Sequence, residues 1–101
     1  MRTICEYELP TKSGEFKLYL PNDYCILDVQ IKNNKPVLWV LADYENENKT
    51  YSFYFMITGA CVTFPVLYIK TIQLPVDFNY CPADGNSTFI LHLFTRLNLD
   101  V

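Results

Sequence analysis

An apolar run of six residues, Val37 to Ala42, constrains the fold of this chain more than any other feature. A strand covered on both faces has a continuous apolar sequence, whereas a strand with one face in water alternates between apolar and polar residues. The preceding stretch, Cys25 to Lys32, alternates in this second way, and Asn33 and Asn34 form a turn signal between the two. The sequence therefore predicts a hairpin over Cys25 to Asp43 whose second strand lies at the centre of the protein.

Alternation assigns the side chains of this hairpin to faces. In the first strand, the residues expected to point toward the core are Cys25, Leu27, Val29 and Ile31. The second strand is apolar on both faces, with Leu38, Val40 and Ala42 on one and Val37, Trp39 and Leu41 on the other. One of these faces should contact the core, and we expect the other to need a second layer.

Further strands are expected along the whole chain, because alternating stretches recur about every ten residues with turn residues between them. They are Arg2 to Leu9, Glu15 to Leu20, Thr50 to Ile57, Leu67 to Gln73 and Thr88 to Phe94, with a short pairing segment at Cys61 to Phe64. No stretch of ten residues has a helical period. The prediction is an all-β fold in one domain, residues 1–101: a small sandwich or partly open barrel of six to seven mainly antiparallel strands, with little or no helix.

The net charge and the cysteine content indicate which binding partners and which cellular compartment to expect. The formal net charge of −3 offers no attraction to nucleic-acid phosphates or anionic lipid, so we expect no DNA, RNA or membrane partner. The acidic Glu6 occurs before any apolar run that is long enough for a signal peptide, which favours a cytoplasmic protein. In that reducing compartment the four cysteines are expected to be free, buried thiols. No Cys-x-x-Cys pair is present, so neither a metal site nor a cofactor is expected.

Self-association is expected from the abundance of apolar residues. The strands that contain Trp39, Tyr54 and His92 each carry apolar side chains on both faces. A domain of this length cannot supply enough second layers to cover all of them. We therefore expect a homo-oligomer, a dimer or larger, in which part of this surface forms the interface.

Two loops could bind a ligand, but each has a simpler interpretation. Asp43 to Lys49 carries interleaved carboxylates, yet it lacks the glycine and the distal glutamate of a calcium loop, so we interpret it as a solvated hairpin loop. Thr58-Gly59-Ala60 interrupts its strand, where glycine allows a positive φ or a close ligand approach. A bulge or turn is the simpler interpretation of this second segment.

Catalysis has little support in the sequence. His92 is the only histidine, and it lies in an apolar strand, where a hydrogen-bonded core or interface group is the more common role. A nucleophile could be Cys61 or Ser52 with Asp77 as the orienting carboxylate, but no spacing supports that choice. We do not expect an enzyme.

Binding is the better supported class, because tyrosine offers a flat contact surface together with a hydroxyl. A nucleotide would need an aromatic ring for base stacking, and cations and backbone amides for phosphate. The candidate ligand residues are Tyr54, Thr58, Gly59, Tyr68, Lys70, Thr71, His92 and Arg96. The competing interpretation is that the aromatic residues are core and the charged residues are a solvated face.

Five stretches carry a resemblance to a known family: Ile26 to Gln30, Pro36 to Asp43, Thr58-Gly59, Tyr68 to Thr71 and His92 to Phe94. Through them the chain is similar, over roughly residues 16–94, to an uncharacterised family of short proteins of tailed phages and prophages. In that family an acidic residue tends to follow the His-x-Phe element, where this chain has Thr95.

The resemblance implies a viral accessory protein. One class of such proteins sequesters cyclic or ADP-ribose-derived nucleotides that bacterial defence systems use as immune signals, without cleaving them. An anti-defence protein of this class is our leading hypothesis. The alternatives are a phage protein that binds a host protein or forms a minor virion component, and a nucleotide-processing enzyme that uses His92.

Overall fold

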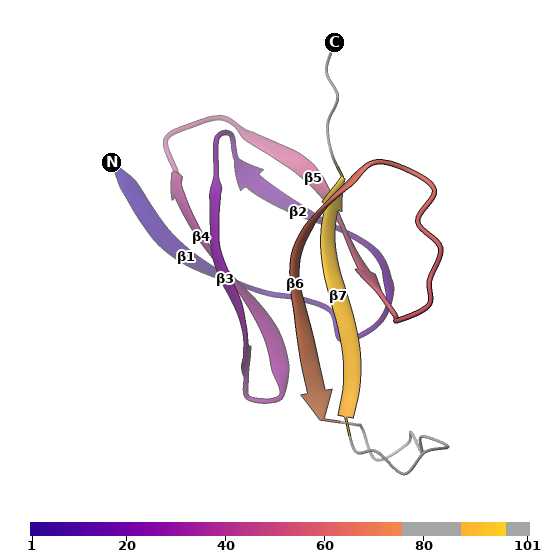
Figure 1. The fold of residues 1–101 in the computed structure, drawn as a ribbon. Coiled ribbons are helices and arrows are strands. Elements are labelled where there is room, and N and C mark those ends of the chain that lie inside the picture. The colour runs from indigo at the N-terminus through magenta and orange to yellow at the C-terminus, as the bar shows by residue number, and fades with distance from the viewer. Residues whose placement is uncertain (76–87, 97–101) are drawn as a thin grey trace.

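The computed structural model describes residues 1–75 and 88–96, and these residues form seven strands and no helix (Figure 1). The all-β prediction is confirmed. No helix that is long and apolar enough to cross a membrane occurs within these two ranges. The strands are β1 (Arg2–Glu8), β2 (Gly14–Pro21), β3 (Cys25–Lys32), β4 (Lys35–Asp43), β5 (Asn48–Met56), β6 (Val66–Pro75) and β7 (Thr88–Arg96).

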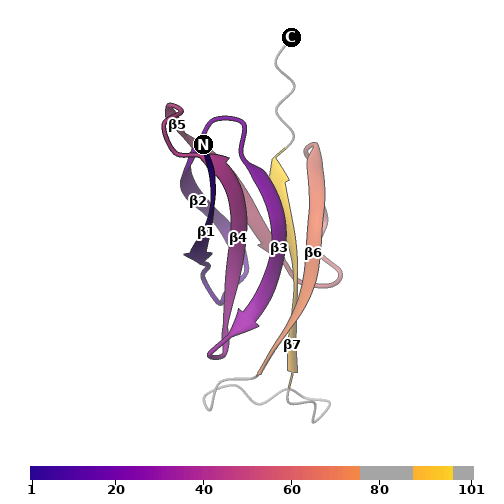
Figure 2. The same ribbon diagram turned by 90° about the vertical axis from the view of Figure 1, so that its left-hand side faces the viewer.

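The strands build two antiparallel sheets that pack face to face. The three-stranded sheet has the order β1-β4-β3, and the four-stranded sheet has the order β2-β5-β7-β6. Figure 2 shows β3 of one sheet beside β6 of the other, so these two edge strands are in contact along one side of the sandwich. The stretch Val76 to Asn86, which has the least regular pattern in the sequence, lies outside the described residues.

The hairpin that the apolar run predicts is confirmed as β3 and β4. Its turn residues, Asn33 (φ 52°) and Asn34 (φ 64°), both have the left-handed backbone that two-residue hairpin turns need. β4 lies between β1 and β3 and is therefore the central strand of its sheet. The sequence located the centre of this sheet correctly.

The core lies between the two sheets and is formed by the inward residues of both. Phe53, Phe55, Leu91 and Leu93 come from the four-stranded sheet and are at most 1% exposed. Facing them from the three-stranded sheet are Val29, Leu38, Val40 and Ala42. The sequence of β5 and β7 is apolar on both faces, and the structure shows which face of each strand is the core side.

The predicted core face of β3 is largely wrong. Only Val29 is buried, whereas Leu27 is 45% exposed and Cys25 is exposed. The register with β4 shifts between Ile26 and Asp28, so Leu27 is an extra residue in a β-bulge. The bulge turns Ile26 toward the core in its place, while Ile31, which is 37% exposed, lies near the tip of the hairpin.

The outer face of β4 is covered largely by its own chain. Val37 is only 4% exposed and Trp39 is half-buried. The Trp39 indole donates to Glu6 Oε1 at 2.9 Å, and Lys32 Nζ lies 3.2 Å from the same carboxylate. A second pair, Lys35 and Glu8 at 3.1 Å, stands next to Val37. Because the stems of such long side chains shield apolar surface, a second subunit is not required to cover this strand.

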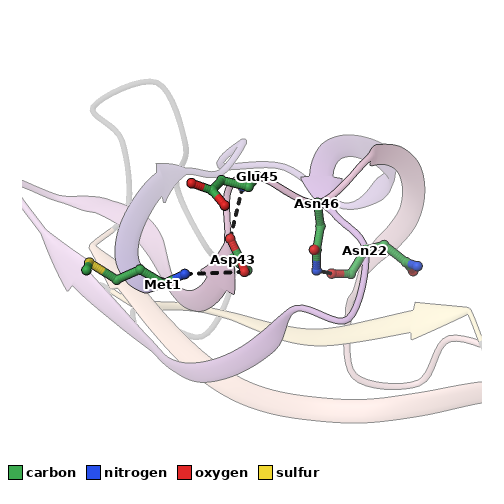
Figure 3. A network of polar contacts seen from close by, with 5 residues as sticks. All are labelled: Met1, Asn22, Asp43, Glu45 and Asn46. Carbon is green, nitrogen blue, oxygen red and sulfur yellow. Dashed lines mark hydrogen bonds and ion pairs between the residues drawn. The ribbon is translucent and has the colours of Figure 1, made fainter.

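The segment between β4 and β5 is not a hairpin loop, because it crosses from one sheet to the other. Asp43 accepts hydrogen bonds from the Met1 ammonium at 3.4 Å and from the Glu45 backbone N–H at 3.0 Å (Figure 3). Asn46 Nδ2 donates to the Asn22 carbonyl oxygen at 3.0 Å. The Glu45 N–H lowers the pKa of Asp43 below its ordinary value, with the Met1 ammonium adding to the effect. Hydrogen bonds thus organise the loop, and no group of side chains suited to a metal ion occurs in the described part of the chain.

The cysteines agree only in part with expectation. Cys5, Cys25 and Cys61 are free thiols, as expected, but Cys25 and Cys61 are exposed and Cys5 is half-buried. Cys25 is exposed because it lies on the outward side of the bulge in β3. Cys81 lies outside the described residues.

Candidate functional site

The outer face of the four-stranded sheet gathers all of the predicted ligand residues except Lys70. We call this surface the His92 face. It consists of outward residues of β5, β6 and β7 together with the turn that follows β5: Tyr54, Thr58, Gly59, Tyr68, Thr71, His92, Phe94 and Arg96.

Strand register arranges the His92 face in two rows. In the first, Phe94 of β7 stands opposite Tyr54 of β5 on one side and Tyr68 of β6 on the other. In the second, His92 stands between Met56 and Thr71 in the same way. Residues directly opposite each other in antiparallel strands point to the same side of the sheet. An aromatic row therefore lies next to a polar one.

His92 is held by hydroxyl groups on both sides. Its Nε2 lies 2.8 Å from Thr58 Oγ1, and its Nδ1 lies 2.8 Å from Thr71 Oγ1. The Thr71 hydroxyl is also 2.8 Å from the Tyr68 hydroxyl. Each hydroxyl can donate or accept, so either neutral tautomer of the imidazole is satisfied. The result is a chain of four polar side chains across the face.

A tight turn places Thr58 in this chain. The Ala60 N–H donates to the Ile57 carbonyl oxygen at 3.2 Å, and Gly59 has a φ of +95°. A positive φ at the third residue is the requirement of a type II turn, which explains glycine at this position. The prediction of a turn with positive φ is confirmed. A Cβ on Gly59 would meet no atom within 4 Å, so the space beside it is open.

The segment after the turn folds back over the sheet. The Phe64 ring lies 4.9 Å from the Tyr54 ring, and the Arg96 guanidinium lies 5.5 Å from the centre of the same Phe64 ring. Tyr54 is therefore buried, with 8% exposed, and offers no ring for stacking. Tyr68 keeps 57% of its surface exposed, while its ring contacts Phe94 edge-on at 5.7 Å. Of the two tyrosines predicted to stack on a ligand, only Tyr68 is open to solvent.

A small open depression lies between the turn and β7. Its volume is about 190 Å³. Ligand pockets in proteins typically measure about 300–1,000 Å³, so this depression encloses only part of a nucleotide-sized molecule. Its lining consists of Met56, Ile57, Thr58, Gly59, Ala60, Val62, His92 and Phe94.

Lys70 does not belong to the His92 face. Alternation over Leu67 to Gln73 predicts that Lys70 shares a face with Tyr68, and this prediction is wrong. The register between β6 and β7 shifts between Tyr68 and Lys70, so Ile69 is an extra residue in a bulge. The shift reverses the alternation, and Lys70 Nζ lies 2.6 Å from Asp28 Oδ1 on β3. The Lys70 charge is therefore paired with Asp28 and does not face a ligand on the His92 face.

Sequence reasoning missed the apolar part of the site. Ile57 and Val62 are 48% and 43% exposed beside the depression, and Phe64 covers Tyr54. The segment Cys61 to Phe64 resembled a short strand, but it pairs with no strand in the described structure. The apolar composition of this segment, directly after the Thr-Gly turn, could have indicated that it packs on the sheet. Alternation alone did not show which surface of the sheet it would cover.

The residues named for catalysis do not form a triad in the described structure. The imidazole could pass a proton between Thr58 and Thr71, since both hydroxyls bond to it. Neither Cys61 nor Ser52 bonds to His92, and no carboxylate among the described residues orients the ring. Asp77 lies outside the described residues.

No family model, no curated protein and no solved structure matches the chain.

Proposed function

We propose that this protein is a non-catalytic binding protein that captures a nucleotide on the His92 face. The observation that carries the proposal is the exposed Tyr68 ring, whose hydroxyl lies 2.8 Å from Thr71 in the chain of groups around His92. An aromatic ring stacks on any base, and neighbouring hydroxyl and imidazole groups can bond to base or ribose edges. The combination fits a ligand that has a flat ring and a polar rim.

The resemblance to phage proteins suggests the biological use of such binding. We propose sequestration of a host nucleotide immune signal, either a cyclic dinucleotide or an ADP-ribose derivative. A protein with this role holds its ligand without changing it. A site with a stacking ring and hydrogen-bonding groups is sufficient for that task.

The proposal includes a second copy of the chain at the site. A depression of about 190 Å³ leaves most of a nucleotide in solvent. Exposed apolar residues stand around it: Ile57 and Val62 beside the turn, and Ile90 at 38% exposure farther along β7. A partner that covers these residues would deepen the site, which is the form of homo-oligomer that the geometry supports.

The same exposed apolar residues favour a second candidate function. Ile57, Val62, Tyr68 and Ile90 resemble the apolar centre of a protein interface more than a solvated sheet face. A phage protein that binds a host protein or forms a minor virion component would use this surface directly. In that case no nucleotide is required.

A ligand screen separates these functions. Thermal-shift and calorimetry measurements with cyclic dinucleotides and ADP-ribose isomers are expected to show tight binding, with the ligand recovered intact. Tyr68→Ala should abolish binding, whereas Tyr44→Ala, which removes a tyrosine whose hydroxyl bonds to Tyr7 of the other sheet, should not. Absence of binding to every nucleotide would contradict the proposal and favour the protein partner. Recovery of an altered ligand that is lost in His92→Ala would indicate the enzyme.

A further inference from the structure

A cationic row crosses the outer face of the four-stranded sheet next to the aromatic row. Lys17 of β2 stands opposite Ser52 of β5. The last pair between β5 and β7 is Phe53 with Thr95, so Arg96 continues the same register and lies across from Ser52. Arg96 points to the same side as Phe94, because alternate residues of a strand share a face. Lys17, Ser52 and Arg96 therefore form one row.

The two cations of this row have no carboxylate partner within residues 1–75 and 88–96, whereas three lysines do. Lys32, Lys35 and Lys70 are each paired with an acidic side chain. Lys17 and Arg96 form no ion pair with any described residue. Glu15, opposite Tyr54 in the adjacent row, also points to this side, so Lys17, Arg96 and Glu15 together carry a net charge of +1 in a chain whose net charge is −3.

The spacing of the row suits one anionic group. Adjacent strands lie about 4.8 Å apart, so the Cα atoms of Lys17 and Arg96, with β5 between them, are roughly 10 Å apart. Both side chains are long enough to meet over Ser52. The Arg96 guanidinium is already oriented by its contact with the Phe64 ring at 5.5 Å, which reduces the entropy lost when it binds an anion.

Only the Arg96 end of the row lies within the length of one nucleotide from the stacking ring, because Ser52 and Lys17 are on strands farther from Tyr68. Arg96 is two residues from Phe94, or roughly 7 Å along the strand, and Tyr68 stands directly opposite Phe94. This separation is comparable with the distance from the base to the phosphate of one nucleotide. A ring stacked on Tyr68 would direct its phosphate toward Arg96.

We infer that the Lys17–Ser52–Arg96 row binds the phosphate of a nucleotide whose base stacks on Tyr68. The inference rests on the proposed function and assigns its phosphate subsite. The sequence predicted Lys70 for this task, but Lys70 is bound to Asp28. Arg96 and Lys17 supply the positive charge in its place, and the Ser52 hydroxyl can donate to a phosphate oxygen.

The test compares two double variants with equal loss of charge. Lys17→Gln/Arg96→Gln removes the row, and Arg2→Gln/Lys12→Gln removes two cations from other parts of the chain. The probes are ADP-ribose, adenosine and inorganic pyrophosphate, titrated by calorimetry. We expect the row variant to weaken ADP-ribose binding by roughly tenfold or more, because it loses the charged hydrogen-bond donors to the phosphate. Adenosine affinity should not change, and the control variant should bind like the wild type.

The outcomes separate this inference from the proposed function. If ADP-ribose binds the wild type and the row variant equally well, the phosphate subsite is wrong and the nucleotide function stands. An equal loss of affinity in both double variants would also overturn the subsite, since net charge would then explain it. If neither ADP-ribose nor adenosine binds, an ADP-ribose derivative is excluded as the ligand of the proposed function, and pyrophosphate alone tests the phosphate subsite. Pyrophosphate binding that the row variant loses supports the subsite, and absence of pyrophosphate binding overturns it.

Discussion

The Lys70 ammonium lies 2.6 Å from the Asp28 carboxylate and so joins β6 to β3, the neighbouring edge strands of two different sheets. Asp28 also accepts hydrogen bonds from Gln30 Nε2 at 2.6 Å and from the Val29 backbone N–H at 2.8 Å. Both side chains of the ion pair are 36% exposed, so water screens part of their attraction. The ion pair holds the two sheets together along the edge formed by β3 and β6.

Stability should depend on pH through Asp28. The Lys70 ammonium, with Gln30 and the Val29 N–H, lowers the pKa of Asp28 from 3.8 to about 2. Because the folded pKa is below the unfolded one, the stabilisation is complete above pH 3.8 and is lost as the pH falls toward 2. Asp28→Asn should therefore lower the urea midpoint at pH 7, and the difference from the wild type should shrink as the pH falls toward 2 and vanish below it.

Glu15→Gln provides the control for this measurement, since Glu15 forms no ion pair with any described residue. Its urea midpoint should follow that of the wild type at every pH. Lys70→Gln should behave like Asp28→Asn. A difference between Asp28→Asn and the wild type that is as large at pH 2 as at pH 7 would show that Asp28 stabilises the fold by something other than its charge.

The bulge in β3 predicts unequal costs for two leucine truncations. Leu38 is fully buried, so Leu38→Ala should cost about 2–5 kcal/mol in free energy of unfolding. Leu27 is 45% exposed in the bulge, so Leu27→Ala should cost under about 1 kcal/mol. Urea denaturation measures both. Similar large losses would mean that Leu27 faces the core, as simple alternation predicts.

Alanine substitutions at two glycines distinguish the effect of backbone strain on stability from a specific effect on nucleotide binding. Gly59 and Gly14 both have positive φ, +95° and +124°, and both have open space where a Cβ would stand. Each substitution to alanine should therefore destabilise the protein through backbone strain alone, by about 1–2 kcal/mol. Gly59→Ala should also weaken nucleotide binding, because the turn holds Thr58 against His92. Gly14→Ala should bind normally, and equal loss of binding in both variants would contradict a specific role for the turn.

Self-association should involve the four-stranded sheet. Light scattering at micromolar concentration is expected to give a mass that is a multiple of the chain mass. Ile90→Lys should reduce it to that of one chain, whereas Ile4→Lys, at a 62% exposed position on the other sheet, should not. A wild-type mass equal to that of one chain would contradict the proposal that a second copy covers the His92 face. Dissociation caused by Ile4→Lys alone would place the interface on the three-stranded sheet.

The sequence was informative where strands follow simple alternation. The hairpin with its two asparagines and the turn at Gly59 both follow from local rules that need no knowledge of strand order. Most of the candidate ligand residues also share one face, since they alternate along neighbouring strands.

The errors arose where local rules fail. Bulges at Leu27 and Ile69 each insert one residue, which reverses the side of every residue that follows until the next irregularity. Lys70 therefore points away from Tyr68. The crossing of the segment after Asp43 from one sheet to the other depends on strand order, which alternation does not encode.

The most direct test of the central claim is a nuclear magnetic resonance titration of the ¹⁵N-labelled protein with ADP-ribose and with a cyclic dinucleotide. The account predicts that amide shifts concentrate at Thr58, Gly59, Tyr68, Thr71 and His92. The indole N–H of Trp39, the only tryptophan, is bonded to Glu6 on the other sheet and should not move. Shifts centred on Trp39 and the three-stranded sheet, or no shifts with either ligand, would contradict nucleotide binding at the His92 face.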